Sequence, residues 1–229
     1  MEHSPEVVDF IDNLQRTRIG PTVFNPWAHF DKDNDASKRS PEIRTENLAR
    51  YLTQRRGRAT TLLVAEAPGY QGAHFSGMAM TSERHLLGRL THKNIFPADA
   101  FACANWERTS KAAVRKDGFI EPTATVVWGM LKDSGVDPRS VVLWNAFAYH
   151  PMRDGYLTNR KPTAEELKKG QPLLEEFLAL FPGVKIIPVG RVSEGILQDL
   201  GIKHAQAYVR HPANGGVTEF RANMRRHWA

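Results

Sequence analysis

Along the chain, short and unbroken apolar runs alternate with longer amphipathic stretches. The apolar runs are typical of strands buried on both faces, and they lie at residues 61–65, 101–104, 141–144, 184–189 and 205–209. The amphipathic stretches have helical spacing and lie at residues 5–16, 42–55, 82–91, 122–134, 163–181 and 191–200. Alternating strands and helices predict an α/β fold, a three-layer α/β/α sandwich around a central, mainly parallel four-stranded sheet.

The chain contains no linker that would divide it, so we expect a single domain over residues 1–229. Residues 1–55 are expected to form a helical and irregular extension packed on that domain. Within this extension, residues 17–41 contain three prolines and an acidic-basic run, a composition that predicts a long surface segment. Thr163 and Glu166 have the spacing of a capping box at the start of a helix.

The composition is that of a soluble globular protein, with 41% hydrophobic and 24% charged residues. The single cysteine, Cys103, excludes an internal disulfide, a four-cysteine zinc site and a cysteine-ligated iron–sulfur cluster. No apolar run approaches the length of a membrane span, and the N-terminus lacks the apolar core of a signal peptide. We therefore expect a cytoplasmic protein without a membrane partner. The net charge of +6 permits a polyanionic partner but does not identify one.

Three polar side chains of different chemistry directly follow predicted strands. In parallel sheets, function concentrates in the loops after the carboxyl ends of the strands, and these loops carry Glu66, Asn145 and His211. A carboxylate can hold a water, an amide can read a base edge, and an imidazole can donate to a leaving group. Taken singly, each residue also has a structural interpretation, as a solvated Glu, a loop-capping Asn or a structural His.

The order of these loops and their short sequence motifs resemble those of the uracil-DNA glycosylase superfamily. Residues 65–69, Ala-Glu-Ala-Pro-Gly, are similar to the Gly-Glu-Ala-Pro-Gly motif of one branch. Residues 145–153 and 159–163 resemble the middle segment, in which an Asn ends a strand and Pro-Thr opens the next helix. His211-Pro212 is similar to the final His-Pro-Ser motif, and the resemblance covers residues 60–224.

This resemblance implies a repair enzyme that flips uracil out of DNA and hydrolyses its N-glycosidic bond, leaving an abasic site. It implies a monofunctional monomer that uses neither a cofactor nor a metal ion, with Glu66 and His211 as the catalytic residues. The implied uracil pocket is formed by Ala67, Gly69, Tyr70, Phe75, Met80 and Asn145. The implied DNA contacts come from Arg153, Arg160, Arg191, Arg210, Asn214 and Gly215.

The sequence departs from the family pattern in the residues that hold and discriminate the base. Met80 stands where relatives usually stack the base on a Phe, so either Met80 or Phe75 takes that position. Gly69 occupies the position at which one branch rejects thymine with a Tyr, and Tyr70 follows it. Ala67 aligns with an Asp or Asn of other branches.

The end of the last motif also differs from the family pattern. Ala213 replaces its Ser, and Val217 is the candidate for the apolar wedge that relatives insert into DNA.

Two other functions remain open at this stage. The first is a glycosylase for another deaminated base, hypoxanthine or xanthine, and the second is a protein that binds uracil or abasic DNA without cleaving it. A calcium loop at Asp31, Asp33, Asp35 and Glu42 is disfavoured, because its turn position is Ala36 rather than Gly.

Overall fold

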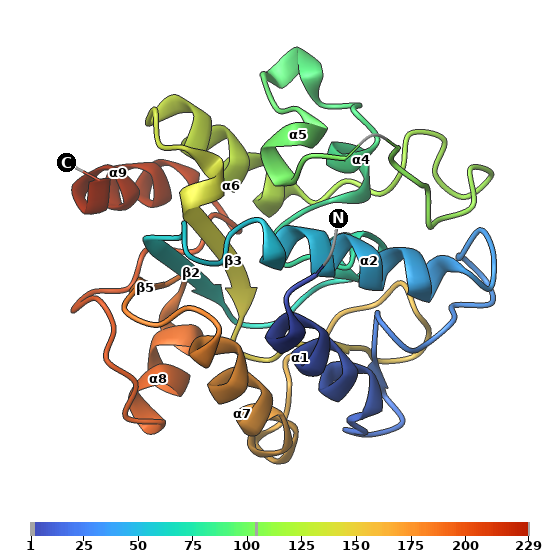
Figure 1. The fold of residues 1–229 in the computed structure, drawn as a ribbon, viewed down its shortest axis with the longest axis horizontal. Helices are drawn as coiled ribbons and strands as arrows, with labels where there is room; N and C mark the ends of the chain where they lie inside the picture. The colour runs from blue at the N-terminus through green and yellow to red at the C-terminus, as the bar shows by residue number, and fades with distance from the viewer. Residues whose placement is uncertain (1–2, 104, 229) are drawn as a thin grey trace.

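The computed structural model describes residues 3–103 and 105–228, and a parallel sheet lies at its centre (Figure 1). The central strand is β2 (Thr61–Ala65), flanked by β3 (Val141–Asn145) and β5 (Lys185–Pro188). Every residue of β2 and β3 is buried, as their continuous apolar sequences predict. The register pairs Ala65 with Asn145, so the carboxyl ends of β2 and β3 finish side by side.

The sheet of the described residues has three strands, not the four predicted. Residues 205–209 run beside β5 but form only one isolated bridge, between Val189 and Val209. The backbone N–H groups of Ala205 and Val209 donate to Ile186 and Pro188, whereas residues 206 and 207 between them bend. The segment therefore contacts the sheet at its two ends without completing a strand.

Residues 101–103 also do not form a strand, and Ala104 lies outside the described residues. Phe101 follows the short helix α5 (Pro97–Ala100), and its ring packs on Trp106 at 4.3 Å between centroids. The carbonyl of Ala100 accepts a hydrogen bond from the buried guanidinium of Arg55, at 2.6 Å. Phe101, the buried residue of the described part of this run, packs in the core beside α5 and does not extend the sheet.

Helices lie on both sides of the sheet (Figure 1). Helices α1 (Pro5–Arg16) and α7 (Ala164–Ala179) pack together against β3, where Trp144 stacks on Phe177 at 4.1 Å and meets Phe10 edge-on. Helix α8 (Arg191–Asp199) contacts β2 and β5, and α6 (Pro122–Asp133) contacts α9 (Val217–Trp228). These five helices, together with α2 (Ser40–Thr53), are the long helices of the described chain.

Short elements occupy the stretches between the long helices. The stretch predicted as one helix over 82–91 divides into α4 (Glu83–Leu86) and η1 (Thr91–Lys93), separated by Gly88 at φ +70°. The turn α3 (Ala73–Ser76) follows the loop after β2, and η2 (Pro138–Ser140) leads into β3. None of the helices in residues 3–103 and 105–228 is long and apolar enough to cross a bilayer.

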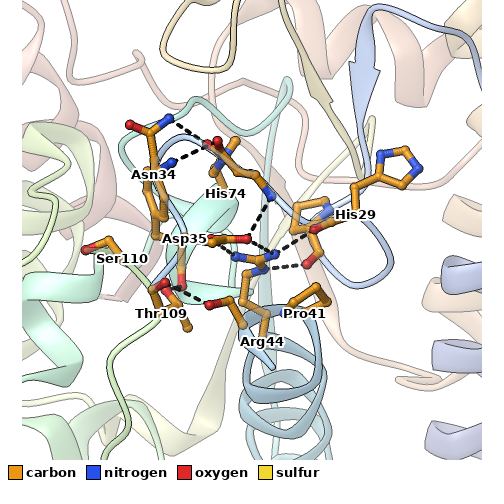
Figure 2. Close-up of polar contacts among 12 residues, drawn as sticks. His29, Asn34, Asp35, Pro41, Arg44, His74, Thr109 and Ser110 are labelled. Atoms are coloured by element: carbon orange, nitrogen blue, oxygen red, sulfur yellow. Dashed lines mark hydrogen bonds and ion pairs between the residues drawn. The ribbon is translucent and has the colours of Figure 1, made fainter. Parts of the chain in front are cut away.

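The sequence predicts that residues 17–41 lie on the surface. In the structure, part of this segment passes through the interior instead. Its strand β1 (Val23–Phe24) pairs antiparallel with β4 (His150–Pro151). Asp35 is buried because Arg44 of α2 neutralises it, with Nη1 2.6 Å from Oδ1 (Figure 2). Arg44 also donates to the backbone carbonyls of Pro26 and His29, so one buried guanidinium holds the segment against α2. Prolines and charges predict a surface loop, but two of the charged side chains, Asp31 and Asp35, are buried and paired inside the protein.

Candidate active site

A cleft of about 970 Å³ opens at the carboxyl edge of the sheet. Segments that are far apart in the sequence form its walls. They are the loop after β2 (66–71), the start of α6 (121–126), the loop 159–161, residues 189–192 and residues 208–219. The cleft therefore lies where parallel sheets of this kind usually place their chemistry.

Glu66 is the first residue after β2 and lines the cleft. Its backbone carbonyl accepts the N–H of Phe147, which fixes the loop after β2 against the loop after β3. The carboxylate itself makes no hydrogen bond to another described residue. Partial burial raises its pKa, while the nearby positive charge of Lys161 opposes this shift. A carboxylate in this state is available to accept a proton from a bound water.

His211 follows the bridge at Val209 and reaches the same cleft. Its Nδ1 accepts the backbone N–H of Ala213 at 3.1 Å, which assigns the proton of the neutral ring to Nε2. Burial lowers the pKa of His211, and the adjacent positive charge of Arg210 lowers it further. The ring is therefore neutral near pH 7 and presents an N–H donor that has no partner among the described residues.

The turn that positions His211 requires a glycine that the sequence analysis did not single out. A Cβ on Gly216 would collide with the backbone carbonyl of His211. Gly216 N donates to Ala213 O at 3.1 Å, and this bond closes the turn. The preceding Asn214 and Gly215 have positive φ, +53° and +78°, as expected for Asn-Gly in a tight turn.

The structure brings some of the sequence-predicted base-pocket residues to the cleft but not the others. Ala67 and Gly69 line it together with Glu66 and His211. Asn145, which pairs with Ala65 in the sheet, does not line the cleft; it is only 4% exposed and makes no side-chain hydrogen bond to the described residues.

Three further predicted pocket residues do not line the cleft. Phe75 is fully buried with its ring stacked on Phe119 at 4.0 Å. Met80 is 4% exposed at φ +45°, and its carbonyl accepts the indole N–H of Trp128. The backbone N–H of Tyr70 donates to Asn159, so this residue holds the cleft wall together.

The predicted DNA contacts also differ in their surroundings. Arg191, Arg210 and Asn214 line the cleft, whereas Arg153 is exposed outside it and Gly215 belongs to the turn after His211. Arg191 donates to the hydroxyl of Tyr208 at 2.8 Å and remains exposed at the start of α8.

Arg160 lines the cleft as well, but its guanidinium already has partners. It donates to both carboxylate oxygens of Glu166, at 2.6 and 2.7 Å, and also to Thr22, Met152 and Lys161. These bonds tie the loop 152–161 to α7 and to the extension.

Two apolar side chains border the cleft and are unusually exposed. Val192 near the start of α8 is 38% exposed, and Val217 at the start of α9 is 37% exposed. Exposed apolar groups at the border of a polar cleft are suited to contact bases or sugars rather than phosphates.

Sequence reasoning missed Glu121, which lines the cleft from the cap position directly before α6. Its Oε2 is buried without a hydrogen-bond partner, and burial raises the pKa of Glu121 to about 7. The one available signal was the pair Glu121-Pro122, which marks a helix start. It does not reveal that the carboxylate lies against Gly72, because the loop after β2 is distant in the sequence.

Comparison with known proteins agrees with this arrangement. The family model of the uracil DNA glycosylase superfamily matches residues 55–214. The chain belongs to this superfamily. Among solved structures, the fold is similar to that of SMUG2 from Pedobacter heparinus, with a TM-score of 0.57 and 13% sequence identity over 97% of both chains. No curated protein sequence matches significantly. Superfamily membership supports a DNA glycosylase, a hydrolase that acts on DNA.

Proposed function

We propose that this superfamily member removes uracil from DNA by hydrolysing the bond between the base and deoxyribose. It would act without a metal ion and leave the DNA strand intact at an abasic site. The observation that carries the proposal is the meeting of Glu66 and His211 in one cleft at the carboxyl edge of the sheet. One supplies an acceptor for water and the other a donor for the departing base.

The proposed reaction begins with a nucleotide flipped out of the helix, which costs a few kcal/mol of unstacking and is easiest at a mismatch. As the glycosidic bond breaks, positive charge develops on the sugar and negative charge on the base. The Nε2–H of His211 would donate to a uracil oxygen, and one such donor lowers a barrier by about 3–4 kcal/mol. Glu66 would orient the attacking water and stabilise the charge on the sugar.

Asn145 is the proposed reader of the base. Its amide has no partner among the described residues and ends the strand beside Glu66. A fixed amide pairs with O4 and N3–H of uracil, whereas cytosine presents a donor in place of O4 and would leave buried polar groups unpaired. Because Asn145 does not line the cleft, contact with the base would require the cleft wall to move. Phe75 of α3, or Met80 shortly after it, would then contact the base.

The proposed DNA surface surrounds the cleft. Arg153, Arg191 and Arg210 would bind phosphates, and the turn at Asn214 and Gly215 would lie against the backbone. Val217 would enter the stack that the flipped base leaves. Arg160 is better suited to hold the loop than to contact DNA, because its donors are already used.

The test uses single-stranded and duplex oligonucleotides that carry one uracil, hypoxanthine, xanthine or thymine, followed by detection of abasic sites. We expect abasic sites from uracil and none from thymine. Release of hypoxanthine or xanthine alone would replace uracil with that base as the substrate. Tight binding of uracil or abasic DNA without any release would identify a non-catalytic reader instead.

A further inference from the structure

Asn159 joins two walls of the cleft through one side-chain oxygen. It lines the cleft from the loop 159–161, and its Oδ1 accepts the backbone N–H of Tyr70, in the loop after β2, at 3.0 Å. The same Oδ1 lies 3.1 Å from Nε2 of His150. That Nε2 also contacts the carbonyl of Thr158 at 2.8 Å, and because a carbonyl can only accept, Nε2 carries the proton. Two N–H donors therefore fix the orientation of the Asn159 amide.

The amide also packs closely against the loop after β2. A Cβ on Gly69 would lie 3.2 Å from Nδ2 and 3.3 Å from Oδ1 of Asn159, so the amide lies directly over this glycine. At the other end of the loop, the carbonyl of Glu66 accepts the N–H of Phe147 at 2.9 Å. The cleft-lining residues 66–69 are therefore held on one side by the loop after β3 and on the other by Asn159.

The support behind Asn159 reaches into the extension. His150 is fully buried in β4, which pairs with β1. Its ring contacts His74 of α3, and His74 contacts Asp31. Strand β1 and Asp31 both precede residues 55–214, the part of the chain that the family model matches. The extension thus supports the cleft wall from outside the matched segment.

We propose that Asn159 is a positioning residue of this site: it fixes the loop that carries Glu66 and does not itself contact the reacting atoms. This inference rests on the proposed function and adds a residue that acts through Glu66. The Glu66 carboxylate has no hydrogen-bond partner among the described residues, so its position depends on the backbone of the loop. A displacement of about 1 Å at a reacting group can lower a rate about 100-fold.

The competing explanation is a direct contact between Asn159 and DNA. Its Nδ2 group makes no hydrogen bond to the described residues and could donate to a bound nucleotide. Asn159→Asp separates the two explanations, because a carboxylate keeps an acceptor for Tyr70 and His150 but has no donor. Asn159→Ala removes both the acceptor and the donor.

The deciding experiment measures single-turnover release of uracil over a range of protein concentrations, which gives a limiting rate and a half-saturating concentration. We expect Asn159→Ala to lower the limiting rate by about 10- to 100-fold and to change the half-saturating concentration little. Asn159→Asp should restore most of the limiting rate. Its added negative charge should instead raise the half-saturating concentration, because DNA is a polyanion.

Asn13→Ala is the matched control. Asn13 also joins the extension to the rest of the chain, since its Nδ2 donates to Glu176 of α7 at 3.0 Å, but it is exposed and lies outside the cleft. Its loss should leave the limiting rate and the half-saturating concentration unchanged. Thermal unfolding of every variant is measured alongside.

Amide hydrogen exchange at Tyr70 gives a second readout that does not require activity. The Tyr70 N–H should exchange faster in Asn159→Ala than in the protein without substitutions, because its acceptor is gone. In Asn159→Asp the exchange should remain slow.

Three results in a protein that releases uracil overturn the positioning role and leave the proposed function standing. They are an unchanged limiting rate in Asn159→Ala, a limiting rate in Asn159→Asp as low as that of Asn159→Ala, and unchanged exchange at Tyr70 in Asn159→Ala. If the protein without substitutions releases no uracil, both proposals are overturned.

Discussion

His74 and His150 meet inside the protein with their Nδ1 atoms 3.0 Å apart. Both side chains are fully buried. His74 also contacts Oδ2 of Asp31 through Nε2 at 3.0 Å, and Nε2 of His150 contacts the carbonyl of Thr158 at 2.8 Å. This row joins the extension, which carries Asp31, to α3, which carries His74, and to β4, which carries His150.

The three contacts of this row cannot all be hydrogen bonds if both imidazole rings are neutral and Asp31 is ionised. Thr158 O can only accept, so His150 Nε2 must donate, and the other two contacts need one proton each. Two neutral rings supply only two of these three protons, so the third belongs to an imidazolium or to Asp31. Burial disfavours an imidazolium, lowering the pKa of His74 to about 3 and that of His150 to about 4. Burial raises the pKa of Asp31, but its hydrogen bonds with His74 and Asn34 outweigh burial and hold that pKa below the ordinary value. The row therefore depends on the contact between Asp31 and His74, where burial of the ring and hydrogen bonding of the carboxylate oppose each other.

The first prediction concerns Asp31. Asp31→Asn supplies an N–H that can donate to His74 while both rings stay neutral, so we expect a loss of about 1 kcal/mol or less in unfolding free energy. Asp31→Ala removes the partner and should cost about 3 kcal/mol or more, as expected for breaking a buried pair. Urea unfolding of both variants measures the difference. Equal losses for Asn and Ala would show that the row needs a carboxylate.

The second prediction concerns His211. His211→Ala should reduce single-turnover excision of uracil by about 100- to 1,000-fold, the effect of losing one donor to developing negative charge. Its affinity for DNA should change little, because the donor acts on charge that forms only during the reaction. His92→Ala, at an exposed position of η1, is the matched control. Full activity of His211→Ala would remove His211 from the mechanism.

The third prediction is a pH dependence of stability at Glu121. Its pKa is about 7 in the folded protein against an ordinary 4.5, so the folded state binds the extra proton between these values. Stability therefore falls as pH rises from about 4.5 to 7. Glu121→Gln does not ionise, so its stability advantage over the unchanged protein should grow across this window, to about 3 kcal/mol above pH 7. Chemical denaturation at pH 5 and pH 8 measures this, and an advantage that is independent of pH would contradict it.

The fourth prediction separates two arginines of the cleft. Arg191→Ala should weaken DNA binding and reduce the slope of log Kd against log salt by about 1, the loss of one phosphate contact. Arg160→Ala should instead lower the unfolding free energy by about 2 kcal/mol, because its bonds to Glu166 hold the loop. Its effect on the salt slope should be small. A large change of slope in Arg160→Ala, with unchanged stability, would reverse these assignments.

The strands β2, β3 and β5 and the long helices from α1 to α8 could be predicted because their signals are local. An unbroken apolar run such as Leu62-Leu63-Val64 satisfies its backbone in a buried strand, and the capping box at Thr163 and Glu166 fixes the start of a helix. Where an apolar run fits either a strand or another buried segment, tertiary packing determines which structure forms. Phe101 after α5 packs in the core, and the segment that ends at Val209 contacts the sheet only at its two ends.

The same distinction between local sequence signals and tertiary packing applies to the site. The sequence by itself determined that Glu66 follows a strand of a parallel sheet and that His211 follows an apolar segment that runs beside the sheet, and hence that they meet at one edge. It also determined the superfamily, since the order of the motifs is a property of the chain. Only the tertiary structure decided that the Arg160 guanidinium already has partners, that Asn145 does not line the cleft, and that Oε2 of Glu121 is buried without a partner. Burial and pairing depend on which distant segments surround a side chain, and no local pattern contains that information.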